Sequence, residues 1–520
     1  MITIKTFSKL KICAAIAGLT VLAACQTATQ TAKVDERDNK PNIVIFYVDD
    51  LGYGDLSSYG ATQVSTPNVD ALAANGIRFT DAHSSAATCT PSRYSLLTGE
   101  HAFRKNAKVL KGDAKMLIEP GSYTLPSMLR KAGYTSAVVG KWHLGLGDGK
   151  NPLDWNAEVK PGPLEIGFDY SYLLPATGDR VPAVYLENYR VENLDKSDPL
   201  YVSYEGKIGD RPVGRENPEL TRQLADNQHN DTIINGISRI GYMQGGHSAE
   251  WKDEDFYTKF TDKANQFIAK NADKPFFLFF PFHDIHVPRL PNEKFQGATD
   301  MGPRGDAIVQ MDWITGQIVK QLEKQGVLDN TIIVFTSDNG PVLDDGYADQ
   351  AIEKLGKHQP ASIYRGGKYS AYEAGTRVPT ILHYPNKVKP GVSNALMSQI
   401  DIYASIAALL GIKLNSDEAI DSENHLAAWF DSNETGRTSL IEEAYTLALR
   451  QGNWKYIAPT NTKTPWVEND KGIESGLNPQ PQLFDLTTDP SEQVNLATEK
   501  PTLVAQMAKQ LEQMTQRTSR

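Results

Sequence analysis

Short apolar runs alternate with helical patterns along most of the chain. The run Asn42 to Val48 (N-I-V-I-F-Y-V) is continuously apolar and ends in charged residues, which is typical of a buried parallel strand whose carboxyl end faces a site. Thr66-Pro67-Asn68 predicts the start of a helix that runs to Ala74. Asn75-Gly76 is a stop signal, and it precedes a strand predicted over Ile77 to Phe79.

The same order of helix, stop and strand recurs further along the chain. The predicted elements are a helix over Leu125 to Lys131, strands over Thr135 to Gly140, Pro275 to Pro281 and Thr331 to Thr336, an amphipathic helix from about Asp306 to Gln325, and a strand over Arg377 to Tyr384. This alternation predicts the α/β class, with a large, mostly parallel sheet that has helices on both faces.

Two regions depart from this alternation. Residues 149–253 are rich in Pro, Gly, Asn and charge, and we interpret them as an insertion that lines a substrate cleft, with a solvated decoration as the alternative. After residue 390 the sequence predicts a strand, turn and strand over Tyr445 to Ile457, a strand over Gln482 to Leu486, and a helix over Pro501 to Met514. We therefore expect a main domain over 41–390 and a small C-terminal α+β subdomain, with a short antiparallel sheet, over 391–520.

The first residues have the pattern of an export signal. Three lysines precede the short apolar stretch from Ile12 to Val21, which is too short for a spanning helix. Leu22-Ala23-Ala24-Cys25 then resembles a bacterial lipobox, in which Cys25 is acylated. The alternative is an ordinary signal that is cleaved at a nearby small residue. We predict a lipoprotein signal peptide over 1–24, a flexible tether over 25–40, and a location in the periplasm or at the outer membrane, where a lipid is the only membrane anchor.

Charge and cysteine content exclude several classes of protein. The formal net charge of −10 argues against nucleic-acid binding through a broad basic face. Of the three cysteines, Cys13 and Cys25 lie in the N-terminal segment, which leaves Cys89 without a partner. A disulfide framework and a cysteine-based zinc site are therefore both excluded, and a solitary cysteine in a structured local pattern is a candidate reaction centre.

Acidic residues follow two of the predicted buried strands. Asp49-Asp50 comes directly after the first strand, and Asp338-Asn339 follows the strand that ends near Thr336. Because ligands bind beyond the carboxyl ends of strands in open α/β sheets, both pairs are expected to converge. Three carboxylates and one amide offer hard oxygen ligands, which suit Ca²⁺ or Mg²⁺ better than zinc or copper. Taken singly, each pair is also a common turn sequence.

A run of eleven residues carries the resemblance to a known family. Cys89-Thr90-Pro91-Ser92-Arg93, extended to Leu97-Thr98-Gly99, resembles the signature of the formylglycine-dependent (type I) sulfatases. Further pieces resemble the family in the same order: Asp49-Asp50-Leu51-Gly52-Tyr53-Gly54-Asp55, Gly140-Lys141-Trp142-His143-Leu144-Gly145, His286-Val287-Pro288, Asp338-Asn339-Gly340, Gly366-Gly367-Lys368, Glu373 with Arg377-Val378-Pro379, Asn453-Trp454-Lys455-Tyr456, and Leu483-Phe484-Asp485-Leu486. The resemblance extends from about Asn42 to Leu496.

The resemblance implies an alkaline-phosphatase-like fold and a sulfuric ester hydrolase. A maturation enzyme would oxidise Cys89 to formylglycine. One hydroxyl of the aldehyde hydrate attacks sulfur, and deprotonation of the other expels sulfate, whereas a thiol would form a stable adduct. Pro91 fits the first turn of a helix, which would place residue 89 at an N-terminus that favours an anion. The resemblance implies that one Ca²⁺, rather than Mg²⁺, is bound by Asp49, Asp50, Asp338, Asn339 and residue 89. Arg93 and His143 would hold the hydrate, and Lys141 and Lys368 would bind the sulfate oxygens. His286 would act as the acid that protonates the leaving oxygen.

The substrate is less closely defined. The chain resembles bacterial polysaccharide sulfatases, and the expected substrate is a sulfated glycan such as carrageenan or a glycosaminoglycan. Five further residues are candidates for contact with the sugar, namely Asp179, Arg180, His247, His283 and Arg289. Two alternative functions remain: a phosphate or phosphonate ester hydrolase of the same superfamily, and a lipoprotein that binds glycan without turnover. Without the family resemblance, the lysines, Arg93 and the histidines would be read as surface charges or packed side chains.

Overall fold

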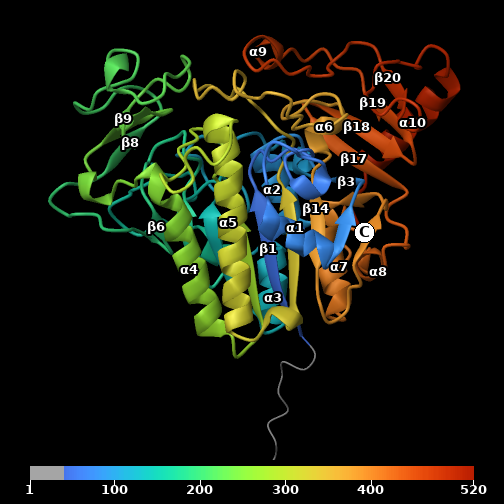
Figure 1. The fold of residues 1–520 in the computed structure, drawn as a ribbon, viewed down its shortest axis with the longest axis horizontal. Helices are drawn as coiled ribbons and strands as arrows, with labels where there is room; N and C mark the ends of the chain where they lie inside the picture. Colours follow the sequence, from blue (N-terminus) through green and yellow to red (C-terminus); the bar gives the residue numbers. More distant parts are fainter. Residues whose placement is uncertain (1–39) are drawn as a thin grey trace, which may run out of the picture.

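The computed structural model describes residues 40–520, and a ten-stranded sheet forms its centre (Figure 1). The five central strands are parallel, and the outer strands include antiparallel pairs. Across the sheet the strands are β15 (Gly391–Ser393), β2 (Ile77–Phe79), β14 (Thr380–His383), β13 (Thr331–Ser337), β1 (Asn42–Val48), β12 (Phe276–Pro281), β4 (Thr135–Lys141), β5 (Tyr170–Leu174), β6 (Leu186–Glu187) and β7 (Arg190–Val191). The predicted mixed, mostly parallel sheet is confirmed.

Helices cover both faces of this sheet. Every residue of β1, β12 and β13 is buried, as expected for apolar strands with cover on two sides. On the face toward the viewer in Figure 1, α5 packs against α1 and α4. A second group of helices is formed by α2, which packs against α3 and α7. Their bounds are α1 (Pro67–Ala74), α2 (Cys89–Thr98), α3 (Leu125–Lys131), α4 (Phe256–Asn271), α5 (Gly302–Lys324) and α7 (Ile402–Leu409).

The C-terminal part forms a second, smaller sheet. Its four antiparallel strands lie in chain order, as β17 (Ser439–Ala444), β18 (Thr446–Gln451), β19 (Trp454–Ile457) and β20 (Gln482–Asp485). Met507 and Leu511 of α10 (Pro501–Thr515) pack on Leu449 and Tyr456 of this sheet. The predicted strand, turn, strand and final helix are therefore confirmed. Before them, β15 still pairs with β2, and β16 (Met397–Ser398) pairs with β3 (Ala82–His83), so the first residues after 390 pair with strands of the main domain.

Residues 149–253 contain more regular structure than the sequence indicated. Tyr170–Leu174 forms β5, which extends the parallel sheet beside β4, and β6 and β7 follow it at the edge. The apolar run of β5 is short and lies among Pro and Gly, so periodicity gave no strand signal there. The rest is loop with short 3₁₀ helices and short strands, the strands being β8 (Tyr201–Ser203), β9 (Ile233–Ile234), β10 (Ile237–Ser238) and β11 (Tyr242–Gln244).

Buried ion pairs join the small sheet to the main domain. Glu373 in α6 (Glu373–Thr376) accepts hydrogen bonds from Arg377 at 2.9 Å, from Arg450 of β18 at 3.0 Å, and from Lys455 of β19 at 3.3 Å. All four residues are buried. Removal of one partner from such a group leaves an uncompensated buried charge, so the Glu373 and Arg377 of the family motif have a structural role.

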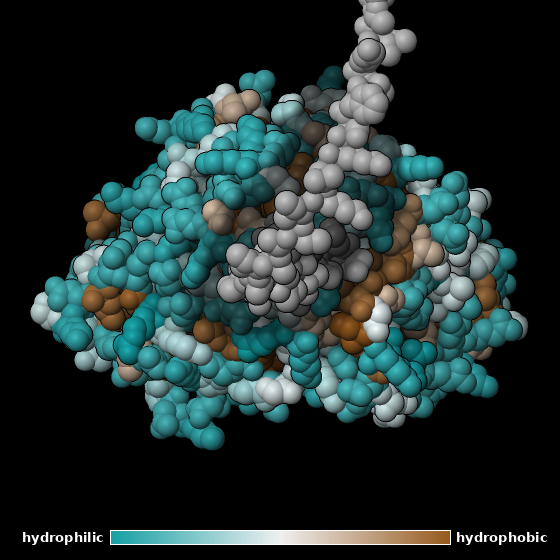
Figure 2. Space-filling model, turned by 90° about the horizontal axis from the view of Figure 1, so that it is seen from below, coloured by the Kyte–Doolittle hydropathy of each residue, from teal (hydrophilic) through white to brown (hydrophobic). Residues whose placement is uncertain are grey.

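The predicted signal peptide over 1–24, the lipidation of Cys25 and the tether up to residue 39 lie outside the described residues. Within residues 40–520, no helix is both long enough and apolar enough to cross a membrane. Figure 2 shows the molecule from below, on the side where β1 begins, and this face is largely hydrophilic with scattered apolar areas. The chemistry described next lies at the opposite edge of the sheet.

Candidate active site

The two acidic pairs meet at the carboxyl ends of β1 and β13. These strands are parallel neighbours with Val48 opposite Ser337, so the residues that follow them are also neighbours. Ligand oxygens of Asp49, Asp50 and Asp338 lie within 4.8 Å of one another, and all three residues are fully buried. The Asn339 amide donates to Asp50 Oδ1 at 2.8 Å. The register of two strands thus gathers four hard oxygen donors from two distant segments.

The unpaired oxygens of this group fit a metal ion. Asp49 Oδ1 and Asn339 Oδ1 are buried and accept no hydrogen bond from residues 40–520. Burial and the neighbouring Asp49 raise the pKa of Asp338 to about 7. Asp50 has a left-handed backbone with φ of 60°, a strained conformation that is frequent at functional sites. A divalent cation among these oxygens would compensate the clustered carboxylates and accept the free lone pairs.

Cys89 is the first residue of α2, beside these carboxylates. Every residue of α2 is buried, and Gly99 caps the helix after Thr98. Gly99 has a φ of 66°, and a Cβ at this position would lie only 2.5 Å from Ala419 Cβ, so there is no room for a side chain. Cys89 Sγ lies 3.4 Å from His143 Nδ1, while His143 Nε2 donates to the Leu110 carbonyl at 2.9 Å. Nδ1 therefore serves as an acceptor for a group on residue 89. Burial raises the pKa of the Cys89 thiol.

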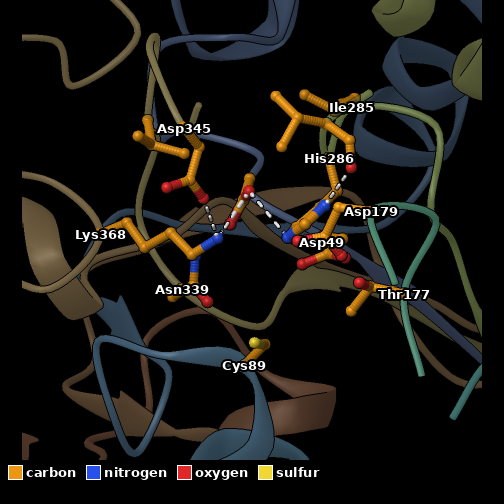
Figure 3. Close-up of polar contacts among 12 residues, drawn as sticks. Asp49, Cys89, Thr177, Asp179, Ile285, His286, Asn339, Asp345 and Lys368 are labelled. Atoms are coloured by element: carbon orange, nitrogen blue, oxygen red, sulfur yellow. Dashed lines mark hydrogen bonds and ion pairs between the residues drawn. The ribbon is translucent and has the colours of Figure 1, made fainter. Parts of the chain in front are cut away.

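Three buried cations neutralise the carboxylates. Arg93 of α2 donates to Asp338 through Nη2 at 2.7 Å, and Lys141 at the end of β4 donates to Asp49. Lys368 Nζ lies 2.9 Å from both Asp50 and Asp345. In Figure 3, Lys368 and His286 approach the group from opposite sides, and Cys89 lies below them.

Two histidines follow β12 at the same edge. His286 Nδ1 donates to the Val287 carbonyl at 2.6 Å, which leaves Nε2 directed to Asp50 Oδ2 at 3.9 Å. His283 is also buried, and neither of its ring nitrogens has a hydrogen-bond partner in the described part of the chain. Burial lowers the pKa of His283 to about 3 and that of His286 well below its usual value. Both rings are therefore neutral in this structure.

A cavity of about 520 Å³ opens over these residues. Four of the six predicted catalytic residues line it, together with Asp179 and Arg180; the four are Cys89, His143, His286 and Lys368, whereas Arg93 and Lys141 lie outside the lining. Asp179 accepts a hydrogen bond from Arg180 at 2.7 Å and lies 3.3 Å from His229 Nε2. Burial lowers the pKa of His229, but the hydrogen bonds that its ring donates to Asp179 and Asp226 outweigh this effect and raise the pKa to about 9.

The other three candidate sugar contacts do not line this cavity. His247 is exposed, with 66% of its side-chain surface accessible, and it pairs with Asp198 at 2.9 Å. Arg289 is buried and binds Asp349 at 2.7 Å together with backbone carbonyls, so its role is structural. His283 packs against His286 and Phe256 beneath the surface.

The cavity also has lining residues that the sequence did not indicate. They are contributed by connections that are remote from one another in the chain, and they include His229, Asp345, Tyr369, Tyr445, Trp466 and Lys471. Asp345 lies shortly after the Asp338-Asn339 motif, in a segment where acidic residues cluster, and this cluster is a local sequence signal that could have indicated it. Tyr445, Trp466 and Lys471 belong to the C-terminal subdomain, and no motif marked them.

The site defines the class of this protein. The site combines buried carboxylates at the carboxyl edge of an α/β sheet, a cysteine at a helix N-terminus, and lysines around one cavity. This combination is typical of a hydrolase that acts on anionic esters. The chain belongs to the sulfatase family, whose model, described as Sulfatase, matches residues 41–412. It is therefore a sulfuric ester hydrolase with the alkaline-phosphatase-like fold.

Individual relatives agree with this assignment. The chain is 49% identical over 498 residues to an N-acetylgalactosamine-6-O-sulfatase of Bacteroides thetaiotaomicron, covering 95% of this chain and 97% of the relative. A solved structure from work on glycosaminoglycan metabolism by Bacteroides thetaiotaomicron has a TM-score of 0.90 and 49% identity, over 92% of this chain and all of the other. A sulfatase from Pseudoalteromonas has a TM-score of 0.67 and 28% identity, over 92% and 90% of the two chains.

Proposed function

We propose that this sulfatase removes O-sulfate groups from a sulfated glycan by means of a formylglycine at position 89 and one bound Ca²⁺. The observation that carries the proposal is the position of Cys89: it begins a buried helix, lines the cavity, and interacts electrostatically with two of the carboxylates and with Lys141 and Lys368. The cysteine sulfur stands where the oxygens of the hydrated aldehyde would be. That hydrate supplies the oxygen nucleophile for sulfur, which the encoded thiol does not.

The metal would be held by Asp49, Asp50, Asp338 and Asn339, together with residue 89. These side chains are buried, and two of their oxygens, Asp49 Oδ1 and Asn339 Oδ1, accept no hydrogen bond from residues 40–520. Hard carboxylate and amide oxygens favour Ca²⁺, and Ca²⁺ tolerates irregular oxygen cages better than Mg²⁺. Once bound, the ion supplies positive charge for the sulfate oxygens.

The other residues have separable roles. His143 Nδ1 accepts a proton from a group on residue 89, because its Nε2–H is committed to the Leu110 carbonyl. Lys141 and Lys368 bring positive charge to the group and would bind sulfate oxygens, while Arg93 keeps Asp338 in place. His286 holds its Nδ1 proton on the Val287 carbonyl, so Nε2 carries no proton in the neutral ring. Nε2 would take up a proton before the reaction, and the imidazolium would then pass that proton to the leaving oxygen.

The sugar is proposed from the relatives. The Bacteroides relative at 49% identity is named for 6-O-sulfated N-acetylgalactosamine, and the chain aligns with almost all of it. We infer a 6-O-sulfated galacto-configured sugar within a glycosaminoglycan or galactan as the substrate. Export to the periplasm or outer membrane, acylation of Cys25 and a partner enzyme that matures Cys89 belong to the same proposal, because the signal pattern and the cysteine motif support them.

A substrate panel tests this function. Protein produced with a maturation enzyme is incubated with N-acetylgalactosamine 6-sulfate, its 4-sulfate isomer and the matching 6-phosphate, and released sulfate or phosphate is measured. We expect release from the 6-sulfate, loss of release after treatment with EGTA, and recovery with Ca²⁺. Preferred release of phosphate would instead support the phosphate ester hydrolase of the same superfamily, and binding without release would support a glycan-binding lipoprotein.

A further inference from the structure

The connection between β19 and β20 is far longer than these strands require. They are antiparallel neighbours, with Ile457 opposite Gln482. Neighbouring antiparallel strands are usually joined by about two to five residues, and connections beyond about 15 residues are usually functional. Here residues 458–481 leave the small sheet, form α9 (Pro465–Asn469), and return. In Figure 1, α9 lies at the top of the molecule, displaced from β19 and β20 toward the centre. We call residues 458–481 the arm.

The arm reaches the catalytic cavity. Trp466 and Lys471 of the arm line the same cavity as Cys89. The Trp466 ring meets the Tyr369 ring edge to face, with centroids 4.8 Å apart, and approaches Tyr445 at 6.3 Å. Tyr369 follows the catalytic Lys368, and Tyr445 lies between β17 and β18. We call Tyr369, Tyr445 and Trp466 the aromatic platform.

The platform is exposed where a ligand would pass. Trp466 retains 36% of its surface and Tyr445 retains 41%, although both belong to a packed cluster of rings. Single exposed aromatic residues are ordinary, but a group of them at the wall of a polar cavity marks a binding surface. The hydroxyl groups of a sugar lie around its rim, so its C–H face packs on an aromatic ring while the rim makes hydrogen bonds.

Lys471 supplies a polar contact beside the platform. The residue is buried, and its Nζ makes no hydrogen bond within residues 40–520. Nζ lies 3.5 Å from Asp345 and 3.6 Å from Asp226, so its charge is balanced while its donors stay free. A buried ammonium with free donors at a cavity wall is suited to a hydroxyl or carboxylate of a ligand.

A second hollow continues from the platform. It has a volume of about 630 Å³ and shares Val109 and Tyr445 with the catalytic cavity. Thr462 of the arm lines it as well. The arm therefore borders both hollows, and Tyr445 lies at the point where they join. A sulfated monosaccharide needs only the first hollow, so the second has room for further residues of a chain.

We propose that the aromatic platform binds the sugar linked to the sulfated residue and that the second hollow receives the chain beyond it. The arm is then a specificity element that makes the enzyme act on oligosaccharides in preference to isolated sulfated sugars. This proposal rests on the proposed function for the identity of the sulfated sugar. The evidence for the platform is the position of Trp466, Tyr445 and Lys471 at the cavity wall.

Kinetics of two substrates test the platform. The probes are N-acetylgalactosamine 6-sulfate and a glycosaminoglycan tetrasaccharide that contains it, and the variants are Trp466→Ala and Trp466→Phe. We expect the ratio of kcat/KM for the tetrasaccharide to that for the monosaccharide to fall about tenfold in Trp466→Ala, mainly through KM, and to be largely restored in Trp466→Phe. Tyr201→Ala is the matched control, because Tyr201 is 52% exposed and lines neither hollow. An unchanged ratio in Trp466→Ala overturns the proposal.

Binding to an inactive variant separates the platform from the proposed function. With Cys89→Ala protein, titration calorimetry should show tighter binding of the tetrasaccharide than of the monosaccharide, and Trp466→Ala in this background should remove the difference. Equal affinities in the Cys89→Ala protein, or binding of neither probe, overturn the platform. Failure of the wild-type enzyme to release sulfate from either probe, with the difference in binding intact, refutes the proposed function and leaves the platform supported.

Discussion

The catalytic cavity has two walls that are built in different ways. The inner wall consists of Cys89, His143, His286 and Lys368, which are all buried and which lie over buried residues at strand ends, such as Asp49 and Lys141. The outer wall consists of long connections, and its Tyr445 and Trp466 are substantially exposed. The register of the paired strands fixes the positions of the inner-wall residues. Connections between elements can vary in sequence and length among related proteins. We propose that the reaction takes place at the inner wall and that the outer wall selects the glycan.

The largest expected effect lies in the inner wall, at Cys89. Cys89→Ala should reduce turnover by at least about 10⁴-fold, as removal of a nucleophile does in other hydrolases. Cys89→Ser should do the same, since the oxidation starts from a thiol. Sulfate release measures the loss, and mass spectrometry of the wild-type peptide with residue 89 should show aldehyde in place of thiol. Turnover retained in the alanine variant, or a wild-type enzyme that is active as thiol only, would contradict the assignment.

A smaller loss is expected at Lys368. Lys368→Ala should lower kcat/KM by about 10²- to 10³-fold, because it removes a preorganised positive charge from the site. It also leaves Asp50 and Asp345 without the cation that now lies 2.9 Å from each. Thermal unfolding should therefore show a lower Tm in the absence of Ca²⁺. Lys354→Ala, a change at an exposed lysine away from the cavity, is the control. A Lys368→Ala enzyme with normal kinetics would remove the lysine from the inner wall.

The outer wall should respond to pH through His229. Because the folded state raises the pKa of His229 to about 9, the pairing with Asp179 and Asp226 stabilises the protein fully below about pH 6.5, and this contribution is lost as the pH rises through 9. The difference is at most about 3.5 kcal/mol, because one pKa unit corresponds to about 1.4 kcal/mol. Urea unfolding between pH 6 and 10 measures it. His229→Gln should flatten this decline, and an equally steep decline in the variant would refute the pairing.

The smallest effect is expected outside both walls. His247→Ala should leave kcat/KM for the tetrasaccharide within about twofold of the wild type, because His247 is exposed and pairs only with Asp198 among the charged groups near it. Arg180→Ala is the contrast, since Arg180 lines the cavity, and we expect its KM to rise about tenfold or more. A large loss in His247→Ala would extend the outer wall to a surface that the cavity does not include.

The sequence by itself determined the elements of the inner wall. Continuous apolar runs specified β1, β12 and β13, and the helix signals at Pro67 and Leu125 specified α1 and α3 at the bounds observed. Since side chains at the ends of parallel strands must share one edge of the sheet, the convergence of Asp49, Asp50 and Asp338 followed from local pattern alone. Cys89 at the start of α2 likewise followed from Pro91 in the first helical turn.

Only the tertiary structure decided the outer wall. β5 carries too short an apolar run to be recognised, and it became visible through its pairing with β4. The placement of Trp466 and Lys471 beside Cys89 depends on how the small sheet docks. Arg289 lies outside the cavity because it is buried against Asp349, and His247 lies outside it because it pairs with Asp198 at the surface. Local patterns encode elements whose hydrogen bonds and burial repeat with a fixed period. A contact between loops hundreds of residues apart has no period, so it arises only from the packing of the whole chain.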